Sequence, residues 1–271
     1  MKISNHQGWA TVQILSPRTT QVSWSVSFEP ADSYGYPVRE PANLWADRVG
    51  VDGVNLKWNA QYYLNAGYHV YLNGALLGYT PMNTFSLRGL DPEAIYTAEV
   101  RTVWDDGTAS EKKAELKFTI KSMLPREMSL ALIEPVRPGV GARGIEINRA
   151  VSGRPLSIGG KQYENGIGTR GGAEIEYDLR GLFDSFSALV GVDDGTNNER
   201  ASVEFVVLGD GKDLWRSGVL KKSDGAKPLQ IDVSGVRRLV LHVKGGGDTF
   251  GRTQSDWVEA TLARRENVAP K

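Results

Sequence analysis

Acidic and amide side chains gather in one short loop of the sequence, VDDGTNNE, which places Asp193 and Asp194 ahead of two Asn residues. Carboxylate and amide oxygens are the ligands that Ca²⁺ prefers, in numbers of roughly six to eight. The spacing differs from that of an EF-hand loop, in which oxygen ligands alternate with other residues before a Gly. A structural calcium ion at Asp193 and Asp194 is therefore one hypothesis. The other is a solvated turn whose Asp and Asn side chains cap backbone groups.

A second acidic loop, LGDGK at 208–212, has a simpler interpretation. A phosphate-binding loop would need Ser or Thr directly after its Gly-Lys pair and a helix behind it, and here Asp213 follows instead. Asp-Gly between two strand-forming runs is a signal for a tight type I′ hairpin. The sequence VEFVVLGDGKDLW therefore predicts two strands joined by a turn at Asp210.

Catalytic chemistry finds little support in the sequence. The chain has three His residues, at positions 6, 69 and 242, no Cys, and neither a G-x-S-x-G nor an H-E-x-x-H motif. A pair of carboxylates like that of a glycosidase is the remaining alternative. The Asp and Glu residues, however, lie in Gly-rich turns or alternate along the polar faces of strands, which is their ordinary role. We expect the chain to be noncatalytic.

The composition is that of an all-β chain rich in turns, with 31 Gly and 12 Pro among 271 residues. The 32 basic residues balance the 32 acidic ones, which argues against nonspecific binding to nucleic acid or to an anionic membrane. No run of apolar residues is long enough to span a membrane. Without Cys there is no disulfide framework and no thiolate metal site.

Short strand patterns separated by turn signals at roughly ten-residue spacing predict a β-sandwich over residues 41–121. Asn73-Gly74 in YLNGALLG is a hairpin signal, and Tyr96 follows the corner GLDPEAIY, where a sandwich can use a tyrosine corner. With Trp58 in VNLKW and with TVWDDGTAS before the last strand, this stretch resembles a fibronectin type III domain. The resemblance implies a spacer or an interaction module.

Residues 1–40 are too few for a domain of their own. Their clearest pattern is in TTQVSWSVSFEP, where every second residue from Val22 to Phe28 is apolar and falls on one face of a predicted strand. Two strands alone do not form a stable fold. We expect this segment to cap the next module or to be the tail of a preceding domain.

A second module is predicted over residues 130–265, after a linker at 122–129. In AEIEYDL, Ile175, Tyr177 and Leu179 share one face while acidic residues share the other, as in a sandwich strand. Five blocks follow one another along it: RPLSIGGKQYENGIGT, IEYDLRGLFDSFSALVGVDD, VEFVVLGDGKDLWRSG, IDVSGVRRLVLHVKGGGD and SDWVEATL. In this order they resemble the NPCBM family, a carbohydrate-binding module with a galactose-binding-like jelly-roll fold.

The resemblance implies a function and a set of site residues. Members of the family are typically appended to glycoside hydrolases, notably α-galactosidases, and several bind galactose-containing glycans; related folds often carry a structural calcium. A sugar site needs an aromatic platform and polar side chains aimed at hydroxyls. Two blocks supply these types where the family's binding loops lie: Tyr163, Glu164, Asn165, Arg170, Asp256 and Trp257. Burial in the core is the competing interpretation for Tyr163 and Trp257, and an ordinary surface charge is that for Arg170.

The sequence departs from the family's pattern in two of these blocks. The GIGT block commonly continues with His and Ala, whereas this sequence has Arg170 and Gly171. The closing block is commonly Asp-His-Ala-Asp-Trp, and Gln254 stands here at the position of its His. Arg can donate hydrogen bonds to sugar hydroxyls, but with a different reach and a permanent charge. These departures bear directly on the inherited specificity for galactose.

We therefore expect an all-β accessory region of a larger glycoside hydrolase, with a fibronectin type III-like sandwich followed by a galactose-binding-like jelly-roll sandwich. Its partners would be a galactose-type or related glycan and the parent catalytic domain, with no nucleic acid and no membrane. The start MKISNHQGW lacks the apolar stretch of a signal peptide, so a secreted or periplasmic location is implied by the family alone. The alternative is a structural or interaction scaffold without a sugar site.

Overall fold

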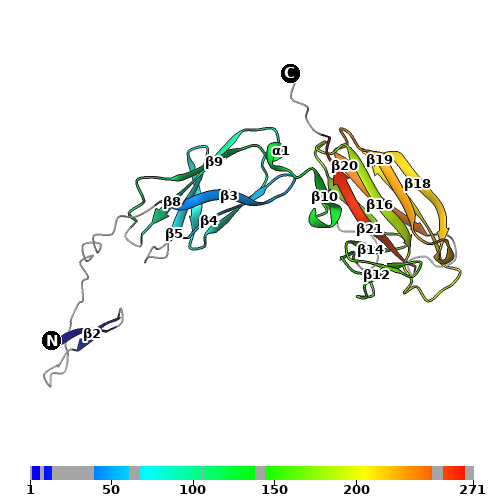
Figure 1. Ribbon diagram of the computed structural model, residues 1–271, viewed down its shortest axis with the longest axis horizontal. Helices are drawn as coiled ribbons and strands as arrows, with labels where there is room; N and C mark the ends of the chain where they lie inside the picture. Colours follow the sequence, from blue (N-terminus) through cyan, green and yellow to red (C-terminus); the bar gives the residue numbers. More distant parts are fainter. Residues whose placement is uncertain are drawn as a thin grey trace, which may run out of the picture. The chain divides into compact units, whose positions relative to one another are not determined.

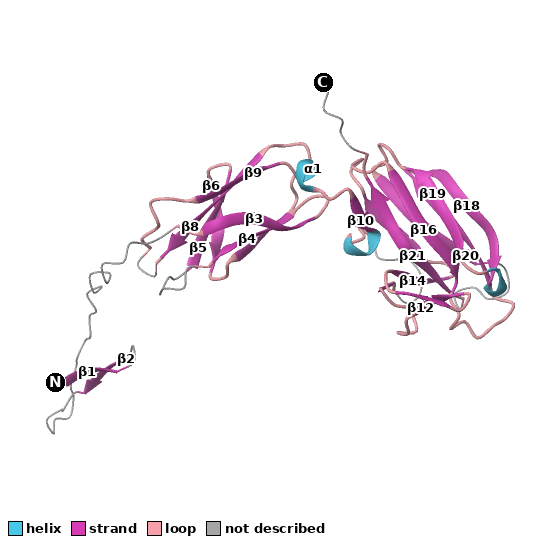
Figure 2. Cartoon of the chain, in the orientation of Figure 1, coloured by secondary structure: helices cyan, strands magenta, loops and turns pink. Residues whose placement is uncertain are grey.

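The computed structural model describes residues 2–6, 9–13, 40–60, 67–104, 107–137, 144–245 and 253–265. Strands dominate these residues, as the composition predicts (Figure 2). The chain divides into two compact units, residues 1–38 and 39–271. In the first unit, β1 (Lys2–His6) and β2 (Trp9–Gln13) form an antiparallel pair. The strand predicted from Val22 to Phe28 lies outside the described residues. Within the described residues, no helix is long and apolar enough to cross a membrane.

The second unit begins with a sandwich of two antiparallel sheets (Figure 1). The three-stranded sheet has the order β3-β4-β7, and the four-stranded sheet has the order β6-β5-β8-β9. The bounds are β3 (Ala42–Val49), β4 (Val54–Asn59), β5 (Gly67–Leu72), β6 (Ala75–Thr80), β7 (Thr84–Leu87), β8 (Tyr96–Val103) and β9 (Ala114–Phe118). Trp58 and Tyr68, one from each sheet, meet edge to face in the core with ring centroids 5.1 Å apart. This is the immunoglobulin-like architecture predicted for residues 41–121.

Turn chemistry in the first sandwich follows the sequence prediction. Asn73 and Gly74 have positive φ angles of 50° and 82°, as both central residues of a type I′ turn require. The Tyr96 hydroxyl accepts a hydrogen bond from the Asp91 amide at 2.8 Å and forms the expected tyrosine corner. Strand β3 was not predicted, because PANLWA reads as an irregular edge. The structure explains the weak signal, since β3 pairs with β4 alone, through two register shifts, and buries no residue completely.

The jelly-roll module is a second sandwich. One sheet has the order β11-β14-β21-β16-β19, with β10 also paired to β21, and the other has the order β15-β20-β17-β18. The bounds are β10 (Glu127–Ser129), β11 (Glu146–Ile147), β14 (Gly166–Arg170), β15 (Glu174–Asp178), β16 (Ser185–Val192), β17 (Ser202–Gly209), β18 (Lys212–Lys221), β19 (Lys227–Asp232), β20 (Arg238–Gly245) and β21 (Gln254–Ala263). The predicted hairpin at Asp210 joins β17 to β18, and Asp210 and Gly211 both have positive φ.

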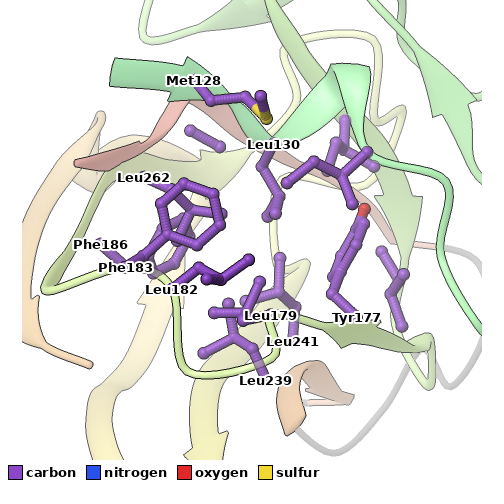
Figure 3. Packing of buried hydrophobic residues seen from close by; sticks show 14 of the residues in the cluster. Met128, Leu130, Tyr177, Leu179, Leu182, Phe183, Phe186, Leu239, Leu241 and Leu262 are labelled. Carbon is purple, nitrogen blue, oxygen red and sulfur yellow. The ribbon is translucent and has the colours of Figure 1, made fainter. Parts of the chain in front are cut away.

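The segment predicted as a linker, residues 122–129, belongs partly to this second sandwich. It begins in the short helix α1 (Ile120–Met123), continues into β10 and leads to the 3₁₀ turn η1 (Leu130–Leu132). Met128 and Leu130 are buried against the end of the core that contains Phe183, Phe186 and Leu262 (Figure 3). The boundary of the module therefore lies several residues before the predicted position 130, because β10 completes the sheet by pairing with β21.

A small hairpin covers the outer face of the sheet that contains β14 and β21. It consists of β12 (Leu156–Ile158) and β13 (Lys161–Tyr163). Leu156, Ile158 and Tyr163 pack there with Val258 of β21 in a cluster separate from the main core. The neighbouring Trp257 points the other way, into the main core, where it meets Phe205 edge to face with centroids 5.0 Å apart. The alternation of side chains along β21 thus gives the sheet two buried faces.

Candidate functional site

Two of the departures from the family pattern lie opposite each other in the structure. Arg170 at the end of β14 and Gln254 at the start of β21 are direct partners in the antiparallel register. Residues directly opposite in such a pair extend to the same face of the sheet. Ile167 and Trp257, at odd spacing from them along the same strands, face the main core. Arg170 and Gln254 therefore belong to the outer face, together with Asp256.

This pair contains two buried polar atoms without a hydrogen-bonding partner, Nε of Arg170 and Oε1 of Gln254. The other side-chain atom of Gln254, Nε2, donates to the Gly195 carbonyl at 3.1 Å, which fixes the amide in place. An unsatisfied buried polar atom costs about 1–3 kcal/mol. In native proteins such atoms usually find a water molecule or a ligand. The end of the β14–β21 pair thus contains one donor and one acceptor that no protein group satisfies, on two half-buried side chains.

The acidic loop beside this pair serves to anchor the small hairpin. The Asp194 carboxylate accepts hydrogen bonds from the Ser157 hydroxyl at 2.5 Å and from the amides of Gly159 and Gly160 at 3.0 and 2.8 Å. The Asp193 carboxylate accepts from the amides of Gly195, at 2.8 Å, and Ser157, at 3.2 Å. The loop that contains Asp193 and Asp194 and contacts Gln254 is therefore held against the turn between β12 and β13.

The calcium hypothesis stays a prediction, and the described residues bear on only part of it. They include no group of three His, Cys, Asp or Glu side chains placed to hold a metal ion. The oxygens of Asp193 and Asp194 that a cation would need are those at which N–H and O–H groups donate. The geometry of both residues is that of the alternative interpretation, side chains that cap backbone groups in a turn.

Asp256 is a buried carboxyl group next to another carboxyl group. It is fully buried, and it lies close to the Asp193 carboxyl group and the Ser157 backbone amide. Burial raises its pKa to about 9, and the neighbouring Asp193 adds to the rise. At neutral pH Asp256 is therefore protonated, and its proton can form an O–H···O bond to Asp193. Asp256 consequently adds no negative charge to the face that it shares with Arg170.

The structure divides the predicted sugar-binding residues between two places. Trp257 and Asp256 are fully buried and Tyr163 is 7% exposed, so none of the three offers a surface to a sugar ring. Trp257 and Tyr163 are core residues, as the competing interpretation of the sequence predicted. Glu164 and Asn165 are exposed in the turn before β14, at the opposite end of that strand from Arg170. At about 3.3 Å per residue, the length of β14 separates them by roughly 15 Å.

Of the predicted set, Arg170 lies at the end of the β14–β21 pair as a half-buried side chain whose Nε no protein group satisfies. The sequence reading placed it in a Gly-flanked loop, whereas it is the last residue of a strand. Gln254 was singled out as a departure but not as a site residue. The sequence alone could not have added it, because Gln254 comes opposite Arg170 only through the pairing of β14 with β21.

The fold and this face define a jelly-roll β-sandwich module of the carbohydrate-binding type. Residues 126–263, just over half of the chain, match the family described as NPCBM/NEW2 domain, and the chain belongs to that family. The matched region begins at the residue before β10, in agreement with the structural boundary. The module is a carbohydrate-binding module that resembles accessory regions of glycoside hydrolases.

Two proteins and one solved structure are similar to this module. A segment of 118 residues is 33% identical to the "Putative endo-alpha-N-acetylgalactosaminidase" of Renibacterium salmoninarum and covers 44% of this chain and 8% of that protein. A segment of 117 residues is 34% identical to the "Alpha-1,3-galactosidase B" of Akkermansia muciniphila and covers 42% of this chain and 14% of that protein. The structure of CBM51 from Clostridium perfringens GH95 in complex with methyl-galactose is 29% identical, covers 51% of this chain and 99% of that one, and has a TM-score of 0.48. The chain thus spans only a small part of the two relatives.

Proposed function

We propose that the jelly-roll module binds a galactose-type or related glycan at the end of the β14–β21 pair, through Arg170 and Gln254. The observation that carries this proposal is that Arg170 and Gln254 lie opposite each other as half-buried side chains, each with one buried atom, a donor and an acceptor, that no protein group satisfies. Neighbouring hydroxyls of a sugar can accept a hydrogen bond from the guanidinium of Arg170 and, once the Gln254 side chain turns to expose its oxygen, donate one to Gln254. The names of the two relatives, a galactosidase and an N-acetylgalactosaminidase, support the choice of sugar class.

In this proposal the chain is a noncatalytic accessory region of a larger, secreted or periplasmic glycoside hydrolase. The immunoglobulin-like sandwich acts as a fibronectin type III-like spacer, and the jelly-roll module holds the enzyme near its substrate. Weak, reversible binding is sufficient for that task, because tethering raises the effective concentration of the catalytic domain near a polymeric glycan.

The test is a titration of the chain with methyl galactoside, with methyl glucoside as the reference sugar, followed by NMR chemical-shift changes that detect millimolar affinity. We expect saturable shifts with the galactoside that are lost in Arg170→Ala and in Gln254→Ala. The matched control is Arg237→Ala, since Arg237 is exposed at the start of β20, away from β14. Galactoside shifts that persist in both site variants would place the sugar elsewhere on the module.

A structural scaffold is the second candidate function. The observation that favours it is the burial of Tyr163 and Trp257, which leaves the predicted set without an exposed aromatic platform. A module that serves only to support or join other domains would show no shifts with any glycan. In the same titration, saturable binding of any sugar that depends on Arg170 would exclude a purely structural role.

A further inference from the structure

Arg170 differs from the other described arginines of the module in that one of its side-chain nitrogens is buried without a hydrogen-bonding partner. Arg137, Arg180, Arg216, Arg238 and Arg265 each lie within 4 Å of a carboxylate. Among the residues that the structure describes, no carboxylate pairs with Arg170, and its Nε is buried without a partner. A guanidinium group is permanently charged. A half-buried cation of this kind is an open position for an anion.

The acidic side chains around Arg170 are already occupied. Asp256, two positions from Gln254 on the same face, is fully buried beside Asp193 and protonated at neutral pH. The carboxylates of Asp193 and Asp194 accept five hydrogen bonds from backbone amides and from the Ser157 hydroxyl. Asp193 and Asp194 keep their charge but are directed at the turn of β12 and β13, and none of the three acids forms an ion pair with Arg170 among the described residues.

Lys222, which contacts the loop beside Gln254, is committed to the protein. Lys222 donates to the Thr196 carbonyl and to the Glu199 carboxylate, both at 2.9 Å. Thr196 in turn exchanges hydrogen bonds with the backbone of Gln254. Lys222 thus supports the loop that holds Gln254, and Arg170 is left as the group that can meet a charged ligand. Its planar fork of N–H donors matches the oxygens of a carboxylate or a sulfate, which it can bind through two parallel hydrogen bonds.

Building on the proposed function, we infer that the glycan carries an anionic substituent, either the carboxylate of a uronic acid or a sulfate ester, which binds the guanidinium of Arg170. Gln254 accepts a hydrogen bond from a hydroxyl of the same sugar through Oε1. The module then selects an acidic glycan over its neutral parent. This selection follows from the combination of a permanent charge at Arg170 and the neutral, sealed state of Asp256 beneath the small hairpin.

The test compares three ligands that differ in one group: methyl galactoside, its 6-carboxylate (the methyl glycoside of galacturonic acid) and its 6-sulfate. Affinities are measured by NMR titration at low and at high salt. We expect at least one of the two anionic ligands to bind about tenfold or more tightly than the neutral one at low salt, since a hydrogen bond to a charged group is of that strength. The preference should shrink as salt screens the charge.

Variants assign the preference to one side chain. Arg170→Gln should abolish it, Arg170→Lys should retain part of it, and the control Arg237→Gln, which removes the same charge elsewhere, should leave it intact. Equal binding of the neutral and anionic ligands by the wild type would overturn this inference and leave glycan binding standing. A preference that survives in Arg170→Gln would overturn it as well. Binding of no ligand at all would overturn the proposed function together with the inference.

Discussion

Arg170 and Gln254 are direct partners across the antiparallel strands β14 and β21, and each leaves one buried side-chain atom without a hydrogen bond. Two of the positions at which the sequence departs from its family's pattern therefore meet at a single point of the fold. Because both side chains lie on the same face, a ligand that satisfies one is within reach of the other. Arg170 and Gln254 therefore change the hydrogen-bonding groups at one place on the sheet together.

The first prediction concerns this coupling. Arg170→Ala and Gln254→Ala should each weaken glycan binding, and the double variant should lose less than the sum of the two single losses. Groups that contact the same ligand commonly show interaction energies of about 0.5–3 kcal/mol. A double-mutant cycle in the glycan titration measures this term. Strict additivity would mean that the two residues contact the ligand independently or not at all.

The buried Asp256 makes stability depend on pH. Its pKa is raised from 3.8 to about 9 in the folded state, so the folded state binds more protons than the unfolded state between these values. The free energy of unfolding should therefore fall as pH rises from about 4 to about 9. Asp256→Asn, which cannot ionise, should remove this component and gain stability relative to the wild type toward alkaline pH.

Urea unfolding at pH 5, 7 and 9 checks this expectation. Asp47→Asn is the matched control, since Asp47 is exposed in β3 of the other sandwich. The difference between Asp256→Asn and the wild type should widen with pH, whereas the control should follow the wild type throughout. Parallel curves for Asp256→Asn and the wild type would show that the carboxyl group does not hold its proton across this range.

The role of Asp194 yields a test of the calcium hypothesis. Its carboxylate accepts three hydrogen bonds that pin the turn of β12 and β13 to the loop before Thr196. Asp194→Ala should lower the free energy of unfolding by about 1–3 kcal/mol, because three partly buried or exposed donors lose hydrogen bonds to a charged acceptor. A chelator should leave the melting temperature of the wild type unchanged. A decrease with chelator that added Ca²⁺ reverses would establish a metal site instead.

The parts of the fold that depend on local chemistry could be predicted from the sequence. Asn73-Gly74 and Asp210-Gly211 set their turns through positive φ angles, and Tyr96 forms its corner five residues from its partner Asp91. Strand β14 could not be predicted in this way. Gly168 interrupts the alternation of apolar and polar side chains along this strand. The position requires Gly, because a Cβ there would lie 2.3 Å from the Arg149 carbonyl oxygen.

The candidate site could be predicted only in part for a related reason. Residue types suited to sugars were recognisable, but their burial depends on which face each strand turns toward the core. Tyr163 and Trp257 supply aromatic rings to two different cores, one on each side of the sheet. The pairing of Arg170 with Gln254 joins strands that lie far apart in the chain, so their shared face follows from tertiary structure alone.

The burial of Trp257 leads to the last prediction. Its side chain is fully buried and packs edge to face on Phe205, so its truncation leaves a large cavity in the main core. Trp257→Ala should lower the free energy of unfolding by about 3–5 kcal/mol. Trp257→Phe retains an aromatic ring and should fold with a smaller loss. If Trp257 acts only in packing, the folded Phe variant should bind a glycan as the wild type does. A Phe variant that is stably folded but no longer binds would show that the indole ring contacts the sugar after all.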